Sequence, residues 1–213
     1  MNSMLDAVLL PKAFYRTMPV SRRTLIFCIC VSGAFSFGYP FLPDNFSALF
    51  VGQPAGIALF NAALTIALLL LTGIVDSFVY CRPISDALRY LSGKLGGYRD
   101  SFLLLKTMKI YALSAVIVNP LYILVSRALF GDIETTRNIG KIQVYLLATA
   151  LMQLWSFGIM SRGMNSVLRF KGVQRVAVFL FVSSWSFIWG IVLRYMVAEF
   201  LLKLYIYTAA LVI

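Results

Sequence analysis

The chain of 213 residues contains no histidine, three cysteines and few charged side chains. Without histidine, His-ligated zinc and nucleophiles activated by a Ser–His or Cys–His pair are excluded. The cysteines, Cys28, Cys30 and Cys81, show neither a pairing pattern nor the spacing of metal ligands. We therefore expect a protein that is not an enzyme, with no catalytic residues, no metal and no cofactor.

Charged residues make up 13% of the chain and hydrophobic residues 61%, against about 25% and about 45–50% in ordinary globular domains. A soluble protein of this length could not bury so much apolar surface in one core. The net charge of +11 would point to nucleic acid in a soluble protein. Here the cations flank apolar runs, where they set orientation and attract anionic headgroups. We therefore expect membrane lipids as partners and no nucleic acid.

Five apolar runs are long enough to cross a bilayer, which requires about 20 mostly apolar residues because lipid offers the backbone no hydrogen-bond partners. The third run carries Lys106 and Lys109 near its start, and we expect these side chains to snorkel to the headgroups. The last stretch, 195–213, could be a sixth span, an extension of the fifth or an interfacial helix, and we favour one of the last two. The sequence thus predicts an all-α transmembrane bundle with about five spans, at 24–42, 51–75, 101–126, 142–161 and 176–193.

Lys and Arg are shared unevenly between the two sides of this bundle. Segments 1–23, 76–109 and 162–175 contain fourteen of them, whereas segments 43–50 and 127–141 contain three. The positive-inside rule therefore places the N-terminus and the two later basic segments in the cytoplasm. We predict a cytoplasmic amphipathic segment at 1–23 and a transmembrane domain at 24–213. The most natural location is the cytoplasmic (inner) membrane of a bacterium.

The segment that follows the second span combines helix and turn signals. Pro83 suits the first turn of a helix and Gly93 its end, so we expect a short interfacial helix and then a glycine-rich turn. Such a turn beside cations is able to hold phosphate, but it is also typical of a tight re-entry that needs positive φ. The residues expected to contact lipid headgroups or a partner are Arg82, Arg89, Lys94, Arg99, Arg169 and Lys171.

Uncharged polar residues interrupt the predicted spans. Asn61, Asn119 and Gln153 each lie within one of them. They either line a path for a solute or form hydrogen bonds between helices, and the second role is the more common one.

Three carboxylates, Asp76, Asp86 and Asp100, fall in the predicted cytoplasmic loop. No charged residue is therefore expected near the centre of a span. The three carboxylates could hold a magnesium ion, but each has Arg or Lys nearby, and ion pairs in the loop explain them better.

Two motifs resemble those of a known family. They are the leader 10–16, Leu-Pro-Lys-Ala-Phe-Tyr-Arg, and the turn 95–102, Leu-Gly-Gly-Tyr-Arg-Asp-Ser-Phe, which leads into a span that carries Asn119-Pro120. Both are similar to motifs of bacterial Yip1-domain proteins, and the shared order of elements would cover essentially the whole chain. The resemblance implies five spans and no catalytic residues. Eukaryotic members, which have a long cytosolic N-terminal region, are implicated in vesicle traffic and in binding Rab-type GTPases.

These features predict a non-enzymatic multipass membrane protein of Yip1-like type. It would organise the bilayer, or bind a membrane-protein partner or another copy of itself, through a basic cytoplasmic face. The alternative is a transporter of a small solute or lipid that uses Asn61, Asn119 and Gln153. A membrane enzyme that acts on lipid phosphate is a third hypothesis, which requires the three carboxylates to cluster.

Overall fold

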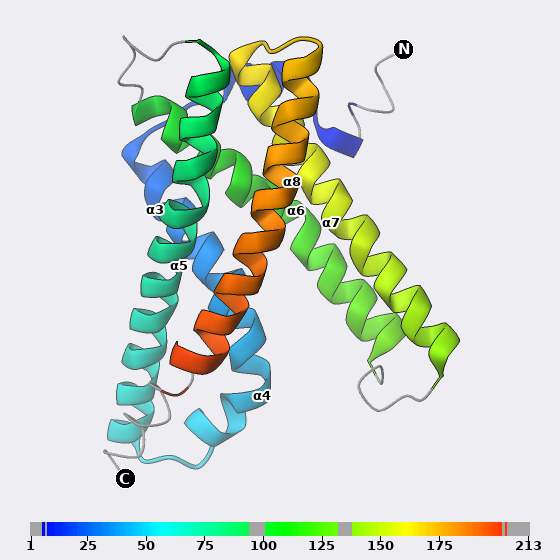
Figure 1. Cartoon of the computed structure of the whole chain (residues 1–213). Coiled ribbons are helices and arrows are strands. Elements are labelled where there is room, and N and C mark those ends of the chain that lie inside the picture. Colours follow the sequence, from blue (N-terminus) through cyan, green and yellow to red (C-terminus); the bar gives the residue numbers. More distant parts are fainter. Residues whose placement is uncertain (1–5, 7, 94–100, 132–137, 202, 204–213) are drawn as a thin grey trace.

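The computed structural model describes residues 6, 8–93, 101–131, 138–201 and 203 (Figure 1). Every regular element within this part of the chain is helical, which confirms the predicted all-α fold. In chain order, the elements are α2 (Lys12–Thr17), α3 (Arg22–Gly33), the π-helix η1 (Ala34–Gly38), α4 (Tyr39–Phe50), α5 (Ala55–Leu91), α6 (Ser101–Phe130), α7 (Ile139–Leu168), α8 (Val173–Tyr195) and the π-helix η2 (Met196–Leu201).

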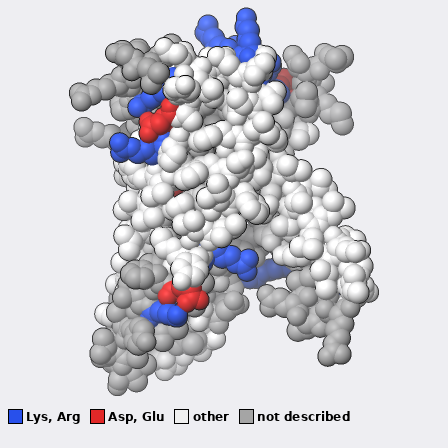
Figure 2. Space-filling model, viewed as in Figure 1, with Lys and Arg blue, Asp and Glu red and all other residues white. Residues whose placement is uncertain are grey.

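Five helical stretches are long and apolar enough to cross a bilayer. Large apolar side chains remain exposed on their outer faces, for example Leu59 (72%), Leu124 (64%) and Phe187 (67%). Figure 2 shows Lys and Arg at the upper end of the molecule, a belt of mostly uncharged residues below it, and further Lys and Arg in the lower part of the view. Hydrocarbon is the solvent that suits such a belt, so the chain is an integral multi-pass membrane protein. The stretches are Arg23–Pro43, Ala55–Leu91, Phe102–Arg127, Ile139–Leu168 and Val173–Tyr195.

The second span is longer than the sequence predicted. α5 runs without a break for 37 residues, past Asp76 and through Pro83, and at 1.5 Å per residue it is about 55 Å long. The expected interfacial helix after Pro83 is therefore the C-terminal part of α5 and not a separate element. Tyr80 and Ile84 are buried on either side of the proline. Their packing holds the helix together although the proline removes a backbone hydrogen bond.

Two glycines allow α3 and α5 to cross with their backbones in contact. A Cβ atom on Gly33 would lie 2.1 Å from the carbonyl oxygen of Leu69, and one on Gly73 would lie 2.0 Å from that of Ile29. Small residues are the usual means by which membrane helices approach so closely. Because the two backbones are in contact at Gly73, the crossing determines which residues of α3 and η1 face the following turn of α5.

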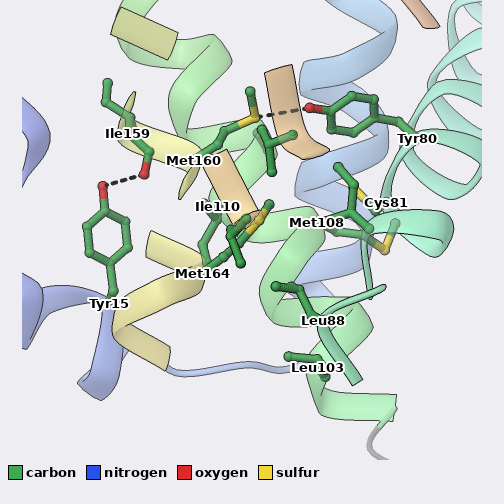
Figure 3. Packing of buried hydrophobic residues seen from close by; sticks show 14 of the residues in the cluster. Tyr15, Tyr80, Cys81, Leu88, Leu103, Met108, Ile110, Ile159, Met160 and Met164 are labelled. Carbon is green, nitrogen blue, oxygen red and sulfur yellow. Dashed lines mark hydrogen bonds between the residues drawn. The ribbon is translucent and has the colours of Figure 1, made fainter. Parts of the chain in front are cut away.

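The helices form a bundle that divides into two groups at its lower end (Figure 1). α3 packs against α5 and α6, α8 packs against α5 and α7, and α2 lies against α7. The lower halves of α6 and α7 run together and diverge from the other spans (Figure 1). The core above this divergence contains Met108, Ile110, Met160 and Met164 (Figure 3). Below, "the basic end" denotes the upper end in Figure 1, which carries α2, the turn between α7 and α8, and the C-terminal end of α5.

Candidate functional site

Tyr15 fixes the short helix α2 against α7 at the basic end. Its side chain is fully buried, and its hydroxyl donates hydrogen bonds to the carbonyl oxygens of Leu9 (2.9 Å) and Ile159 (3.3 Å) (Figure 3). Gly163 makes room for the ring, because a Cβ atom there would lie 2.9 Å from it. Burial raises the pKa of the Tyr15 phenol, so the neutral phenol is the form that anchors α2.

A tight turn joins α7 to α8 at the same end. Arg169 caps α7 in a left-handed backbone conformation (φ 57°), and Gly172 (φ 51°) precedes α8. A residue other than glycine keeps this conformation only where its surroundings impose it. Here Phe170 is buried beneath the turn, and its N–H donates to the carbonyl oxygen of Asn165 (3.1 Å). The turn leaves the side chains of Arg169 and Lys171 exposed.

α2, the end of α7 and the beginning of α8 surround a cavity of about 750 Å³, which we call the basic cavity. Ligand sites typically measure about 300–1,000 Å³. Leu9, Gly158 and Phe179 contribute an apolar part of its wall, and Ser161 and Ser166 contribute hydroxyl groups. Six cationic side chains also line it: Lys12, Arg16, Arg162, Arg169, Lys171 and Arg175.

Three of the four arginines in this cavity are held by the main chain. In each case the Nε–H of the guanidinium donates to a carbonyl oxygen, which leaves terminal N–H groups available for another acceptor. A guanidinium fixed in this way presents a rigid fork of donors that matches phosphate or carboxylate oxygens. The three bonds run from Arg16 to Ser166 (3.3 Å), from Arg162 to Leu10 (3.0 Å) and from Arg175 to Phe170 (2.7 Å).

Among the described residues, few acidic side chains compensate the positive charge of the basic cavity. Asp6 forms an ion pair with Arg162, and within the described residues it is the one carboxylate paired with a cation of this cavity. No hydrogen bond or ion pair joins the side chains of Arg169 and Lys171 to other described residues. Five of the six cations therefore have no acidic partner there.

The basic cavity combines predicted and unpredicted residues. Arg169 and Lys171 belong to the predicted contact set. Arg162 and Arg175 contributed to the sequence predictions only through the count of Lys and Arg that set the orientation, whereas Lys12 and Arg16 belong also to the leader motif 10–16. About 150 residues separate the N-terminal cations from those of α7 and α8, so no local spacing in the sequence could have brought them together.

The other predicted contact residues lie apart from this cavity. Arg82 is exposed on α5, and Arg89, two turns further on, forms an ion pair with Asp86 (3.5 Å). Lys94 and Arg99 lie outside the described residues.

A second cavity, of about 260 Å³, lies between α6 and α7. Asn119 and Gln153 both line it, together with Tyr122 and Ser156. No hydrogen bond joins either amide to another described residue. Two of the three predicted intramembrane polar residues therefore share one site. The third does not, because Asn61 is buried elsewhere.

Asn61 has a structural contact of its own. Its Nδ2 donates to the carbonyl oxygen of Leu49 at 2.9 Å, which ties α5 to the end of α4. This amide therefore belongs to the packing of the bundle, the commoner of the two roles expected for it.

α5 places a carboxylate inside the bundle, where the sequence predicted a cytoplasmic loop. Asp76 is fully buried and accepts hydrogen bonds from Ser36 Oγ (2.8 Å), Trp189 Nε1 (2.7 Å) and the Tyr111 hydroxyl (3.0 and 3.1 Å). None of these donors is charged, and no ion pair of Asp76 is found among the described residues. The prediction that no charged residue lies near the centre of a span is therefore wrong for Asp76, which lies in the middle part of the span Ala55–Leu91. A buried carboxylate is tolerated here because hydrogen bonds satisfy both of its oxygens.

No family model matches the chain, and no curated protein or solved structure matches it. The class is therefore defined by the fold: an integral multi-pass membrane protein with five helices that are long and apolar enough to span the bilayer. The similarity to Yip1-domain proteins stays a prediction from the sequence.

Proposed function

We propose that the protein is non-enzymatic and organises the bilayer by gathering anionic phospholipids around its basic end. In the orientation predicted from the sequence, this end faces the cytoplasm. A cytoplasmic leaflet that contains anionic lipid attracts juxtamembrane basic segments, at about 1 kcal/mol per Lys or Arg near the surface. The protein would thus create a local patch of anionic lipid, on which other membrane proteins or further copies of the chain assemble.

The basic cavity is the single observation that carries this proposal. It brings six cations from three helices and the turn between α7 and α8 into one place, and one carboxylate partner, Asp6, is found among the described residues. Scattered surface cations would only set topology. Cations held together around a cavity next to an apolar belt also provide a place for a headgroup whose acyl chains remain in the hydrocarbon.

Electron spin resonance of spin-labelled lipids tests the proposal. The full-length protein is reconstituted in phosphatidylcholine vesicles with a trace of spin-labelled phosphatidylglycerol or spin-labelled phosphatidylcholine. We expect a larger immobilised fraction for the anionic label, and a smaller difference at high salt because screening weakens exposed charge interactions. Equal immobilised fractions for the two labels would contradict the proposal.

A pair of charge-matched variants makes this test specific. The variant Arg169→Gln/Lys171→Gln removes two cations from the basic cavity and should reduce the preference for the anionic label. The control, Lys141→Gln/Arg194→Gln, removes two cations near the lower end of α7 and α8 (Figure 1) and should leave the preference unchanged. A protein partner that co-purifies in stoichiometric amount, and is lost only from the first variant, would instead favour docking of a partner on the basic end.

The cavity between α6 and α7 favours a second candidate function, passage of a small uncharged solute. Asn119 and Gln153 supply amide donors and acceptors that have no hydrogen-bond partner among the described residues and lie within apolar helices, where water is scarce and an unsatisfied polar group is costly. We expect Gln153→Leu to abolish any flux of glycerol or urea into proteoliposomes. Gln143→Leu, an exposed position on the same helix, serves as the control. A Gln153→Leu variant with the flux of the parent protein would remove this candidate.

A further inference from the structure

We propose that the basic cavity is a specific site for a ligand with two neighbouring phosphate groups, such as the headgroup of a diphosphate phospholipid. The inference rests on the proposed function and narrows it from general attraction of anionic lipid to recognition of one headgroup chemistry. Three properties of the cavity support it: its charge, its fixed donors and its mixed polar and apolar wall.

The net positive charge of the basic cavity indicates how many phosphate groups the ligand carries. After Asp6 has paired with Arg162, five cations remain without an acidic partner among the described residues that line the cavity. A phosphodiester brings one negative charge, so a single one leaves most of this charge uncompensated. Two adjacent phosphates match it better. Basic pockets at helix ends on the cytoplasmic side of membrane proteins hold headgroups of this kind.

The geometry of the arginine side chains indicates how the cavity would contact the ligand. The guanidinium groups of Arg16, Arg162 and Arg175 are anchored through Nε, so less conformational freedom is lost when their terminal N–H groups bind a ligand. Arg169 and Lys171, from the strained turn, line the same cavity. With a volume of about 750 Å³, the cavity is large enough for more than one phosphate group among these donors.

The wall of the cavity indicates an amphiphile. Leu9, Gly158 and Phe179 provide apolar surface beside the cations, and Gly158 lies one helical turn from Arg162, on the side that leads into the membrane span. A lipid fits this arrangement, with phosphates on the cations and the beginning of its acyl chains on the apolar wall. A soluble diphosphate would contact the cations but not the apolar wall. The lipid and the soluble ligand therefore differ in the part of the cavity that they occupy.

Native mass spectrometry of the full-length protein in mild detergent tests the site. The probes are cardiolipin, which has two phosphates, phosphatidylglycerol, which has one, and inorganic pyrophosphate, which has two and no acyl chain. We expect cardiolipin to bind at least about ten-fold more tightly than phosphatidylglycerol, because each charge-assisted contact with phosphate contributes about one order of magnitude. Pyrophosphate that binds as tightly as cardiolipin would identify a soluble diphosphate as the ligand, and weak binding of pyrophosphate would identify the lipid.

Two variants with equal changes of charge decide whether the cavity is responsible. Arg169→Gln/Lys171→Gln should weaken cardiolipin binding about ten-fold or more. The fold should be kept, because both side chains are exposed and form no hydrogen bond or ion pair with other described residues. Lys141→Gln/Arg194→Gln, which removes two cations at the other end of α7 and α8 and outside the cavity, should bind cardiolipin like the parent protein. Circular dichroism checks that both variants retain the parental helix content.

Equal affinity of the parent protein for cardiolipin and phosphatidylglycerol would overturn the inference, as would equal losses in the two variants. In either case, a preference for anionic spin-labelled lipid would still support the general function. Loss of that preference as well would refute both proposals together.

Discussion

Replacement of Asp76 by alanine should strongly destabilise the bundle, because this carboxylate joins four helical segments. Its oxygens accept hydrogen bonds from Ser36 of η1, Tyr111 of α6 and Trp189 of α8. The alanine variant leaves all three donors without an acceptor in a site that is closed to solvent. The perturbation is therefore a loss of three interhelical contacts at one point.

The magnitude follows from the number of bonds. Interhelical hydrogen bonds in membrane proteins contribute about 0.6–1.7 kcal/mol each, so three of them correspond to about 2–5 kcal/mol. This is a large part of a total stability of about 5–15 kcal/mol. Asp76→Asn should cost about 1 kcal/mol or less, since its amide oxygen still accepts from Trp189 and its NH₂ group donates to the hydroxyls of Ser36 and Tyr111.

Thiol labelling provides the assay. Cys28 and Cys81 are fully buried, whereas Cys30 is exposed, so in a Cys30→Ser background labelling by a maleimide reports opening of the bundle. We expect Asp76→Ala to be labelled faster than the parent protein by a factor of about thirty or more, the equivalent of 2 kcal/mol. Asp76→Asn should remain within about ten-fold of the parent. Parental labelling of the alanine variant, or equal acceleration in both variants, would refute this account of Asp76.

Two further predictions concern the helix crossing and the anchor of α2. Gly73→Ala, which would place a Cβ atom 2.0 Å from the carbonyl oxygen of Ile29, should force α3 and α5 apart and lower the free energy of unfolding by about 1–3 kcal/mol. Gly190→Ala, which meets open space, should be neutral in the same labelling assay, and a neutral Gly73→Ala would contradict the close crossing. Since burial raises the pKa of Tyr15 above that of an unfolded tyrosine, about 10, the anchor should hold below that pH and be lost as the pH rises further. The fluorescence of Trp155, whose indole N–H donates to the N-terminal segment at 2.7 Å, should report this loss, and a Tyr15→Phe variant that shows the same alkaline change would contradict it.

The membrane spans were predictable because their signal is local. Each requires about 20 apolar residues in sequence, and no other part of the fold has to be known. The length of α5 was not predictable in this way. The apolar run ends where Asp76 begins, so a rule based on composition stops the span there. The helix continues because the acceptors of this carboxylate are satisfied by donors that lie 35, 40 and 113 residues away.

The candidate site was only partly predictable for the same reason. Counting Lys and Arg identified the basic side, and two residues of the basic cavity, Arg169 and Lys171, were in the predicted contact set. The cavity itself depends on Tyr15, which ties α2 to α7 through the carbonyl oxygen of Ile159, 144 residues away. Asn119 and Gln153 likewise meet only because α6 and α7 pair along their lengths. Contacts of this range are properties of the packed bundle and leave no spacing in the sequence.

The central claim is that the basic end faces the cytoplasm, where anionic headgroups meet it. Its most direct test is labelling with a membrane-impermeant maleimide in a Cys30→Ser background, in which the two remaining native cysteines are buried. Lys171→Cys reports the basic end, and Val51→Cys, an exposed position between α4 and α5, reports the opposite end (Figure 1). We predict that Val51→Cys is labelled in intact cells and that Lys171→Cys is labelled only in inside-out vesicles. The reverse pattern would place the basic end outside the cytoplasm and contradict the proposed function.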